Sequence, residues 1–199
     1  MAYGARISRS RVAAAMNRLA ALGYAVPGAV IAIGVLIPAA RIDNLVADAL
    51  SALFGLSVGL VLTGSIVALV YAYLIRFLAV ALQSVESGLA RITPAMEDAA
   101  RSLGLGPAET LARVHLPMMR SSLVTAALLV FVDVMKELPA TFVMRPFNFD
   151  TLAVQAYNLA ADERLAEAST ASLAIVAVGL VPIIVAARRM VRPETPREG

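Results

Sequence analysis

Residues 168–187 have the sequence ASTASLAIVAVGLVPIIVAA, a run of 20 residues without a charged side chain. At a rise of about 1.5 Å per residue, a helix of this length measures about 30 Å, which matches the hydrocarbon core of a bilayer. Two further charge-free windows, residues 19–40 and 49–75, are also long enough to cross a membrane. A fourth apolar run continues past Asp133, and we expect it to form a span over about residues 119–138. The sequence therefore predicts an all-α membrane protein with about four transmembrane helices.

The composition of the whole chain agrees with this fold class. Of its 199 residues, 60% are hydrophobic and 16% are charged, whereas soluble proteins have about 45–50% apolar and about 25% charged residues. The apolar excess excludes intrinsic disorder, and the absence of cysteine excludes a disulfide-stabilised secreted module. We expect residues 1–199 to form a single transmembrane domain with the lipid bilayer as its surroundings.

The basic residues predict the orientation of the chain. Thirteen of the 17 lie in the N-terminal segment, the long connection between the second and third spans, and the tail. These residues are Arg6, Arg9, Arg11, Arg18, Arg76, Arg91, Arg101, Arg113, Arg120, Arg188, Arg189, Arg192 and Arg197. By the positive-inside rule, these regions and both termini are expected to be cytoplasmic. Topology thus explains the net charge of +3, and nucleic acid is not an expected partner.

The cytoplasmic connection, about residues 86–117, has the pattern of two short helices joined by a glycine turn. Thr93 suits an N-cap and Pro94 the first helical position, and Gly104 suits a left-handed stop. A second short helix is expected from Gly106 through Val114. A DNA-binding helix-turn-helix is excluded, because the would-be recognition helix offers one Arg and no Asn or Gln for base edges. An amphipathic connector and a docking element for a cytoplasmic partner both remain open.

This connection resembles the signature loop of binding-protein-dependent ABC transporter permeases. Asp98-Ala-Ala is followed after three residues by Gly104 and after nine more by Val114-His-Leu-Pro117. The family pattern has Glu for Asp98 and Ile for Val114, with the same spacing. The resemblance implies a type I ABC importer permease whose loop seats in a cleft of a cytoplasmic ATPase. The implied coupling residues are Glu97, Asp98, Ala99, Ala100, Gly104, Val114, Leu116 and Pro117.

Other stretches are similar to the ferric iron permeases within this family. They are Leu22–Gly28, residues 76–80, residues 136–139 and residues 145–153. The resemblance covers the last part of the second half of such permeases, so the chain is expected to be part of a larger permease. It implies a bacterial inner (plasma) membrane protein that works with an ATPase, a substrate-binding protein, and a second permease half or homologous subunit. Ferric iron is the suggested cargo, with thiamine, polyamine or sulfate as alternatives.

Charged residues near the end of the third span form the second candidate site. Asp133, Lys136 and Glu137 are spaced to share one helix face, and Pro139 is expected to bend or end the helix. Ionisable groups at membrane depth tend to face a bundle interior or a watery path. They either line or gate the translocation route, or they form a self-neutralising salt-bridge cluster. On the outer side, Arg145 and Asp150 are candidates for contact with a binding protein, and a solvated loop is the alternative.

Several chemistries are not expected. No phosphate-binding Gly-Lys-Ser/Thr motif is present, since the only lysine is Lys136, so energy has to come from a partner. The chain has no cysteine and one histidine, so we expect no metal site and no cofactor, and His115 is expected at the surface. An intramembrane enzyme and a non-transporting membrane fragment are the alternatives from other classes, and no nucleophile–base pair supports an enzyme.

Overall fold

The computed structural model describes residues 3–4, 11–57 and 59–191, and the regular structure in these ranges is helical. Arg6, Arg9, Arg192 and Arg197, which the sequence assigns to the cytoplasmic side, lie outside the described residues. The elements are α2 (Arg11–Leu22), α3 (Gly28–Phe54), α4 (Ile66–Leu89), α5 (Pro94–Ser102), α6 (Pro107–Thr110), the π-helical turn η1 (Leu111–His115), α7 (Leu116–Met118), α8 (Arg120–Met135), α9 (Pro139–Met144), α10 (Leu152–Ala161) and α11 (Leu165–Val191).

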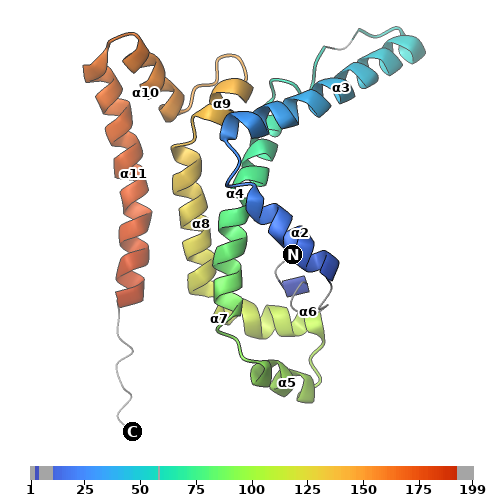
Figure 1. The fold of residues 1–199 in the computed structure, drawn as a ribbon, viewed down its shortest axis with the longest axis vertical. Coiled ribbons are helices and arrows are strands. Elements are labelled where there is room, and N and C mark those ends of the chain that lie inside the picture. Colours follow the sequence, from blue (N-terminus) through green and yellow to red (C-terminus); the bar gives the residue numbers. More distant parts are fainter. Residues whose placement is uncertain (1–2, 5–10, 58, 192–199) are drawn as a thin grey trace.

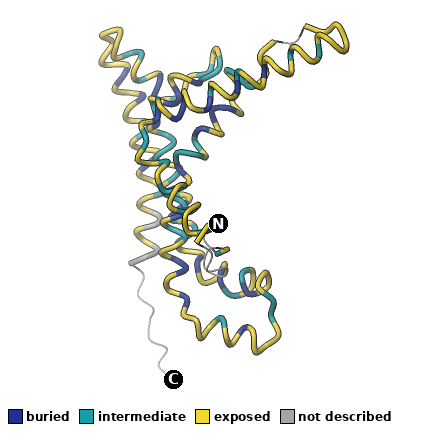
Figure 2. Tube along the Cα trace, turned by 45° about the vertical axis from the view of Figure 1, so that its right-hand side comes forward, coloured by how far each residue is buried: buried dark blue, intermediate teal, exposed yellow. Residues whose placement is uncertain are grey.

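An antiparallel pair of helices, α4 and α8, forms the centre of the molecule, and α11 runs beside α8 (Figure 1). The short helices α5–α7 lie at one end of this pair, and α9 and α10 lie at the other (Figure 1). Helix α3 leans away from the bundle, and much of its surface is exposed (Figure 2). Close packing near the α5–α7 end involves Gly88, because a Cβ there would lie 2.8 Å from Cβ of Ser122.

Among the residues that the structure describes, three helices are long and apolar enough to cross a membrane: Gly28–Phe54, Ile66–Leu89 and Leu165–Ile184. A fourth span is reached if Pro107–Met118 and Arg120–Met135, which meet at 74°, are taken as one broken span. The all-helical fold class with three to four spans is therefore confirmed. The expected window over residues 168–187 lies within α11.

The helix boundaries differ from the first two expected windows. The window 19–40 is divided by the break between Leu22 and Gly28, and α3 then continues past Asp43 to Phe54. The window 49–75 contains the end of α3, an irregular segment between α3 and α4, and the start of α4. Charge alone does not mark these boundaries, because a charge-free stretch can form a loop as well as a helix. A helix can also contain a charged residue when other parts of the fold supply hydrogen bonds to it.

Asp43 explains how α3 carries a charge. Its side chain is buried, and its carboxylate accepts hydrogen bonds from the backbone N–H groups of Val61, Leu62 and Thr63 at 2.7–3.1 Å. The segment after α3 is therefore folded back along its own helix. Gly55 ends α3 in the left-handed conformation at φ +66°, and Ser65 accepts the N–H of Ala68 to begin α4.

Two buried apolar clusters lie at opposite ends of α4. The first is built from α3, α4 and α9, and it contains Ile31, Ala32, Val35, Ala68, Leu69, Ala72, Ala140 and Met144. The second contains Leu82, Leu89, Ile92 and Met119. A single continuous helix, α4, thus connects the core beside α9 with the core beside the short helices.

Candidate functional site

The helix–turn–helix segment forms as the sequence predicts. Helix α5 begins after Thr93 with Pro94 at its first position, although the Thr93 side chain makes no capping hydrogen bond. At its other end, the N–H of Leu105 bonds to the carbonyl of Ala100, and the N–H of Gly104 bonds to that of Arg101. This is the paired Schellman arrangement, and it requires the left-handed conformation that Gly104 adopts at φ +82°.

The second half of the segment is one helical run with a π-helical turn. Helix α6 begins at Pro107, where the N–H of Gly106 bonds to the Glu109 carboxylate at 3.3 Å. The turn η1 follows and ends at His115, and α7 carries Leu116 and Pro117. The chain then bends into α8. The motif ends at this bend, where Val114 is half-buried and Leu116 is exposed.

The two neighbouring acidic residues of the motif point in different directions. Asp98 is exposed and pairs with Arg101 within α5 at 2.6 Å. Glu97 turns inward, and its carboxylate lies 3.5 Å from Nε2 of His115. Ala99 is exposed and Ala100 is buried. Of the two carboxylates, Asp98 is therefore the one available at the surface.

The expectation that His115 is a surface residue is wrong. Its side chain is fully buried between Glu97 and the ring of Tyr3, whose centroid lies 4.8 Å from the imidazole. The π-helical turn and the fold of α5 against it enclose the imidazole, and no sequence pattern indicates this. Sequence reasoning also missed Leu103, an apolar side chain beside the turn that is 82% exposed.

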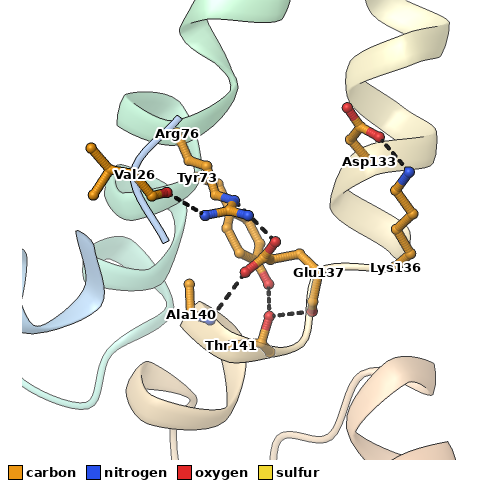
Figure 3. A network of polar contacts seen from close by, with 8 residues as sticks. All are labelled: Val26, Tyr73, Arg76, Asp133, Lys136, Glu137, Ala140 and Thr141. Atoms are coloured by element: carbon orange, nitrogen blue, oxygen red, sulfur yellow. Dashed lines mark hydrogen bonds and ion pairs between the residues drawn. The ribbon is translucent and has the colours of Figure 1, made fainter. Parts of the chain in front are cut away.

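The three charged residues near the end of α8 do not form one cluster (Figure 3). Helix α8 ends at Met135, so Glu137 lies beyond the helix and does not share a face with Asp133. Lys136 pairs with Asp133 at 2.8 Å, and Lys136 is mostly exposed. Pro139 begins α9, which confirms that the helix ends before it.

Glu137 instead pairs with Arg76, a residue in the interior of α4 (Figure 3). Nε of Arg76 lies 3.1 Å from the Glu137 carboxylate, and the two side chains are 17% and 6% exposed. A second nitrogen of Arg76 donates to the carbonyl of Val26 at 2.9 Å, and the carboxylate accepts the N–H of Ala140 at 3.1 Å. Arg76 therefore lies within α4 and not in the connection that follows it. Its assignment to the cytoplasmic connection is wrong.

Further contacts close this network. Thr141 is fully buried and donates to the carbonyl of Glu137 at 2.7 Å, which leaves its oxygen to accept a hydrogen bond from Tyr73. Gly28, the first residue of α3, has no room for a side chain, because a Cβ would collide with the Glu137 carboxylate. No sequence pattern connects Gly28 with the charged residues.

The outer candidates Arg145 and Asp150 form an ion pair across one loop. Arg145 also lies over the ring of Phe142, 5.6 Å from its centroid. The loop surrounds an open pocket of about 400 Å³ and presents Phe147 fully to solvent. Within the part of the chain that the structure describes, no group of three or more His, Cys, Asp or Glu residues is placed to hold a metal ion.

Comparison with known proteins matches residues 1–197 to the family described as "Binding-protein-dependent transport system inner membrane component". The chain is 26% identical over 175 residues to the Fe(3+)-transport system permease protein FbpB 2 of Haemophilus influenzae, covering 88% of this chain and 31% of that protein. It is 31% identical over 120 residues to the putative 2-aminoethylphosphonate transport system permease protein PhnV of Salmonella paratyphi A, covering 60% of this chain and 45% of that protein. The chain thus spans less than half the length of these curated relatives.

Proposed function

The chain belongs to the family of binding-protein-dependent transport system inner membrane components, and from that premise we propose that it is a membrane-spanning part of a bacterial ABC importer. In this role residues 86–117 form the coupling segment, which connects a cytoplasmic ATPase to the helices that cross the membrane. The chain holds no nucleotide-binding motif of its own, which is the expected division of labour for a transport component.

The observation that carries this proposal is the exposed turn between α5 and α6. The Schellman turn at Gly104 holds two short helices at one end of the α4–α8 pair (Figure 1). Leu103 is an exposed apolar residue at the end of α5, the helix that carries the exposed pair of Asp98 and Arg101. Protein interfaces combine apolar contacts with a polar rim, and this turn offers side chains of both kinds.

The packing around this turn supports transmission of motion into the membrane helices. Ile92, within the segment, and Met119, just after it, are both buried against Leu82 and Leu89 of α4. Met119 also lies directly at the start of α8. A displacement of the segment therefore acts on α4 and α8 together, because a close-packed core transmits strain and does not deform freely.

Ferric iron is the cargo that we propose first, on the strength of the relative from Haemophilus influenzae. The similarity to the PhnV protein favours 2-aminoethylphosphonate as a second candidate. Selection of either cargo is assigned to a separate binding protein, for which the loop with Arg145, Phe147 and Asp150 is the proposed dock. Uptake of radiolabelled ferric iron and of 2-aminoethylphosphonate by cells expressing the transporter distinguishes the two candidates.

The coupling proposal is tested at Leu103 in the transporter that contains this chain. Leu103→Ser removes an exposed apolar side chain without altering the core, and it is expected to weaken capture of the ATPase by about tenfold, as for a residue at the centre of an interface. Leu103→Met is the matched control, because it keeps an apolar side chain of similar volume. Equal ATPase capture by both variants would show that this turn is not the docking surface.

A further inference from the structure

Two breaks between helices meet at the Arg76–Glu137 pair (Figure 3). Arg76 bonds to the carbonyl of Val26, in the break between α2 and α3. Glu137 lies in the break between α8 and α9 and bonds to the N–H of Ala140, near the start of α9. The close approach of Gly28 brings the start of α3 to the same point.

The pair satisfies backbone groups that these breaks leave without helical partners. Ile31 and Val30 both donate to the carbonyl of Pro27, so the Val26 carbonyl is outside the helical ladder and accepts from Arg76. The N–H of Ala140 lies in the first turn of α9, where no helical acceptor exists. In a membrane an unsatisfied backbone group is costly, so broken helices there need side chains that replace the missing bonds.

The pair lies far from the coupling segment, between α4 and the break that follows α8. Arg76 is 13 residues from the end of α4 at Leu89, which corresponds to about 20 Å along the helix. Glu137 follows the end of α8 opposite Met119. The ion pair therefore lies near the middle of α4 and just beyond the end of α8, about 20 Å along α4 from its end at Leu89.

We propose that Arg76 and Glu137 form a latch, which closes the transport pathway at the level where α8 ends and separates during each transport cycle. This inference rests on the proposed function, because the force that opens the latch comes from the coupling segment. When α4 and α8 shift relative to each other, the two charges part and both need water. Opening the latch therefore hydrates a region that the closed state keeps buried.

A cysteine in place of Ala140 can report on this hydration, because the substitution leaves both charged residues unchanged. Its side chain is fully buried in the closed state, and the chain contains no native cysteine. In the complete transporter reconstituted in liposomes, Ala140→Cys is expected to react about tenfold faster with a water-soluble thiol reagent during ATP turnover than at rest, as the open population rises. Ala126→Cys, a buried site within α8, is the control and is expected to stay protected in both states.

A second experiment tests the charges themselves. Glu137→Gln keeps the size of the side chain but removes the attraction to Arg76, so the latch is expected to open without the binding protein. ATP hydrolysis should then lose most of its dependence on the binding protein, with transport reduced by about tenfold. Glu167→Gln is the matched control, because Glu167 pairs with Arg164 at an exposed site, and it should behave like the parent.

The outcomes separate the latch from the proposed function. If Ala140→Cys is equally protected at rest and in turnover while ATP hydrolysis still responds to the binding protein, the latch is wrong and the importer assignment stands. If the parent complex shows neither cargo uptake nor stimulated ATP hydrolysis, the proposed function fails first. Should Glu137→Gln prevent assembly, the Ala140→Cys measurement still decides, because it leaves the ion pair intact.

Discussion

Several partners surround the carboxylate of Glu137 at its buried position. The carboxylate faces the Arg76 guanidinium and accepts an N–H from Ala140, and the start of the 27-residue helix α3 lies against it. The positive end of a helix dipole favours a carboxylate at this place. Removing one partner of a buried ion pair costs about 3–5 kcal/mol, because the remaining charge stays buried without compensation. The same carboxylate lies so close to residue 28 that a glycine fits there best.

Gly28→Ala is therefore expected to destabilise the protein. The added methyl group would occupy the space of the Glu137 carboxylate and lie 3.0 Å from a nitrogen of Arg76, and overpacking of this kind costs about 1–3 kcal/mol. Gly34→Ala is the matched control, because it lies in the same helix with no atom within 4 Å of the new Cβ. Thermal unfolding in detergent measures both; a melting temperature of Gly28→Ala at or above that of Gly34→Ala would contradict the close approach.

Gly104 and Gly106 provide a similar comparison in the coupling segment. At both glycines an added Cβ would have no atom within 4 Å, but Gly104 has φ +82° and Gly106 has φ −73°. Gly104→Ala is expected to cost about 1 kcal/mol, since an L-residue is strained in the left-handed region. Gly106→Ala should be close to neutral. Proteolysis of the α5–α6 turn, followed with time, should be faster for Gly104→Ala alone, and equal rates would argue against a strained turn.

Residue roles were predictable where they depend on local conformation and not where they depend on tertiary contacts. The left-handed turn at Gly104 and the helix end before Pro139 follow from backbone preferences alone. The burial of His115 and the partnership of Arg76 with Glu137 join residues distant in the sequence. A cluster of three charges near one span end suggested a local pairing, which holds only for Asp133 and Lys136.

At the scale of elements, α3 shows why spans cannot be delimited by charge alone. The helix is 27 residues long and contains Arg41, Asp43 and Asp48, which the sequence indicated as a connection. Asp43 is compatible with the helix because the returning segment supplies three N–H donors. The existence of apolar helices was predictable from composition, but these boundaries depend on contacts between residues about twenty positions apart.

Asp43→Asn is expected to loosen the segment that returns along α3 at Val61, Leu62 and Thr63. An amide has one acceptor oxygen and would place its NH₂ group against the N–H of Thr63, which leaves a partly buried donor unsatisfied at a cost of about 1–3 kcal/mol. Asp48→Asn is the matched control, because Asp48 is an exposed residue of the same helix. Hydrogen exchange of these three backbone N–H groups should accelerate only in Asp43→Asn. No change in their exchange would show that the carboxylate does not hold this segment.

At the scale of the whole molecule, apolar side chains are exposed along complete helices. Leu173, Val176 and Val181 of α11 and Ile33, Ile37 and Leu45 of α3 are each about half exposed or more. A continuous apolar surface of this kind is typical of contact with lipid or with another membrane subunit. With Arg76 placed inside α4, the basic residues still gather at the end with the coupling segment, so the positive-inside rule continues to favour that end as cytoplasmic.

We propose from this asymmetry that the coupling segment faces the cytoplasm, and two single-cysteine variants of the cysteine-free chain test this orientation. Leu103 and Phe147 are 82% and 102% exposed and lie beyond opposite ends of the α4–α8 pair. In intact spheroplasts, a membrane-impermeant thiol reagent is expected to label Phe147→Cys and to leave Leu103→Cys unmodified. Permeabilising the membrane should make Leu103→Cys reactive, which controls for its exposure. Labelling of Leu103→Cys from outside would invert the orientation, and the ATPase could then not reach the turn at Gly104.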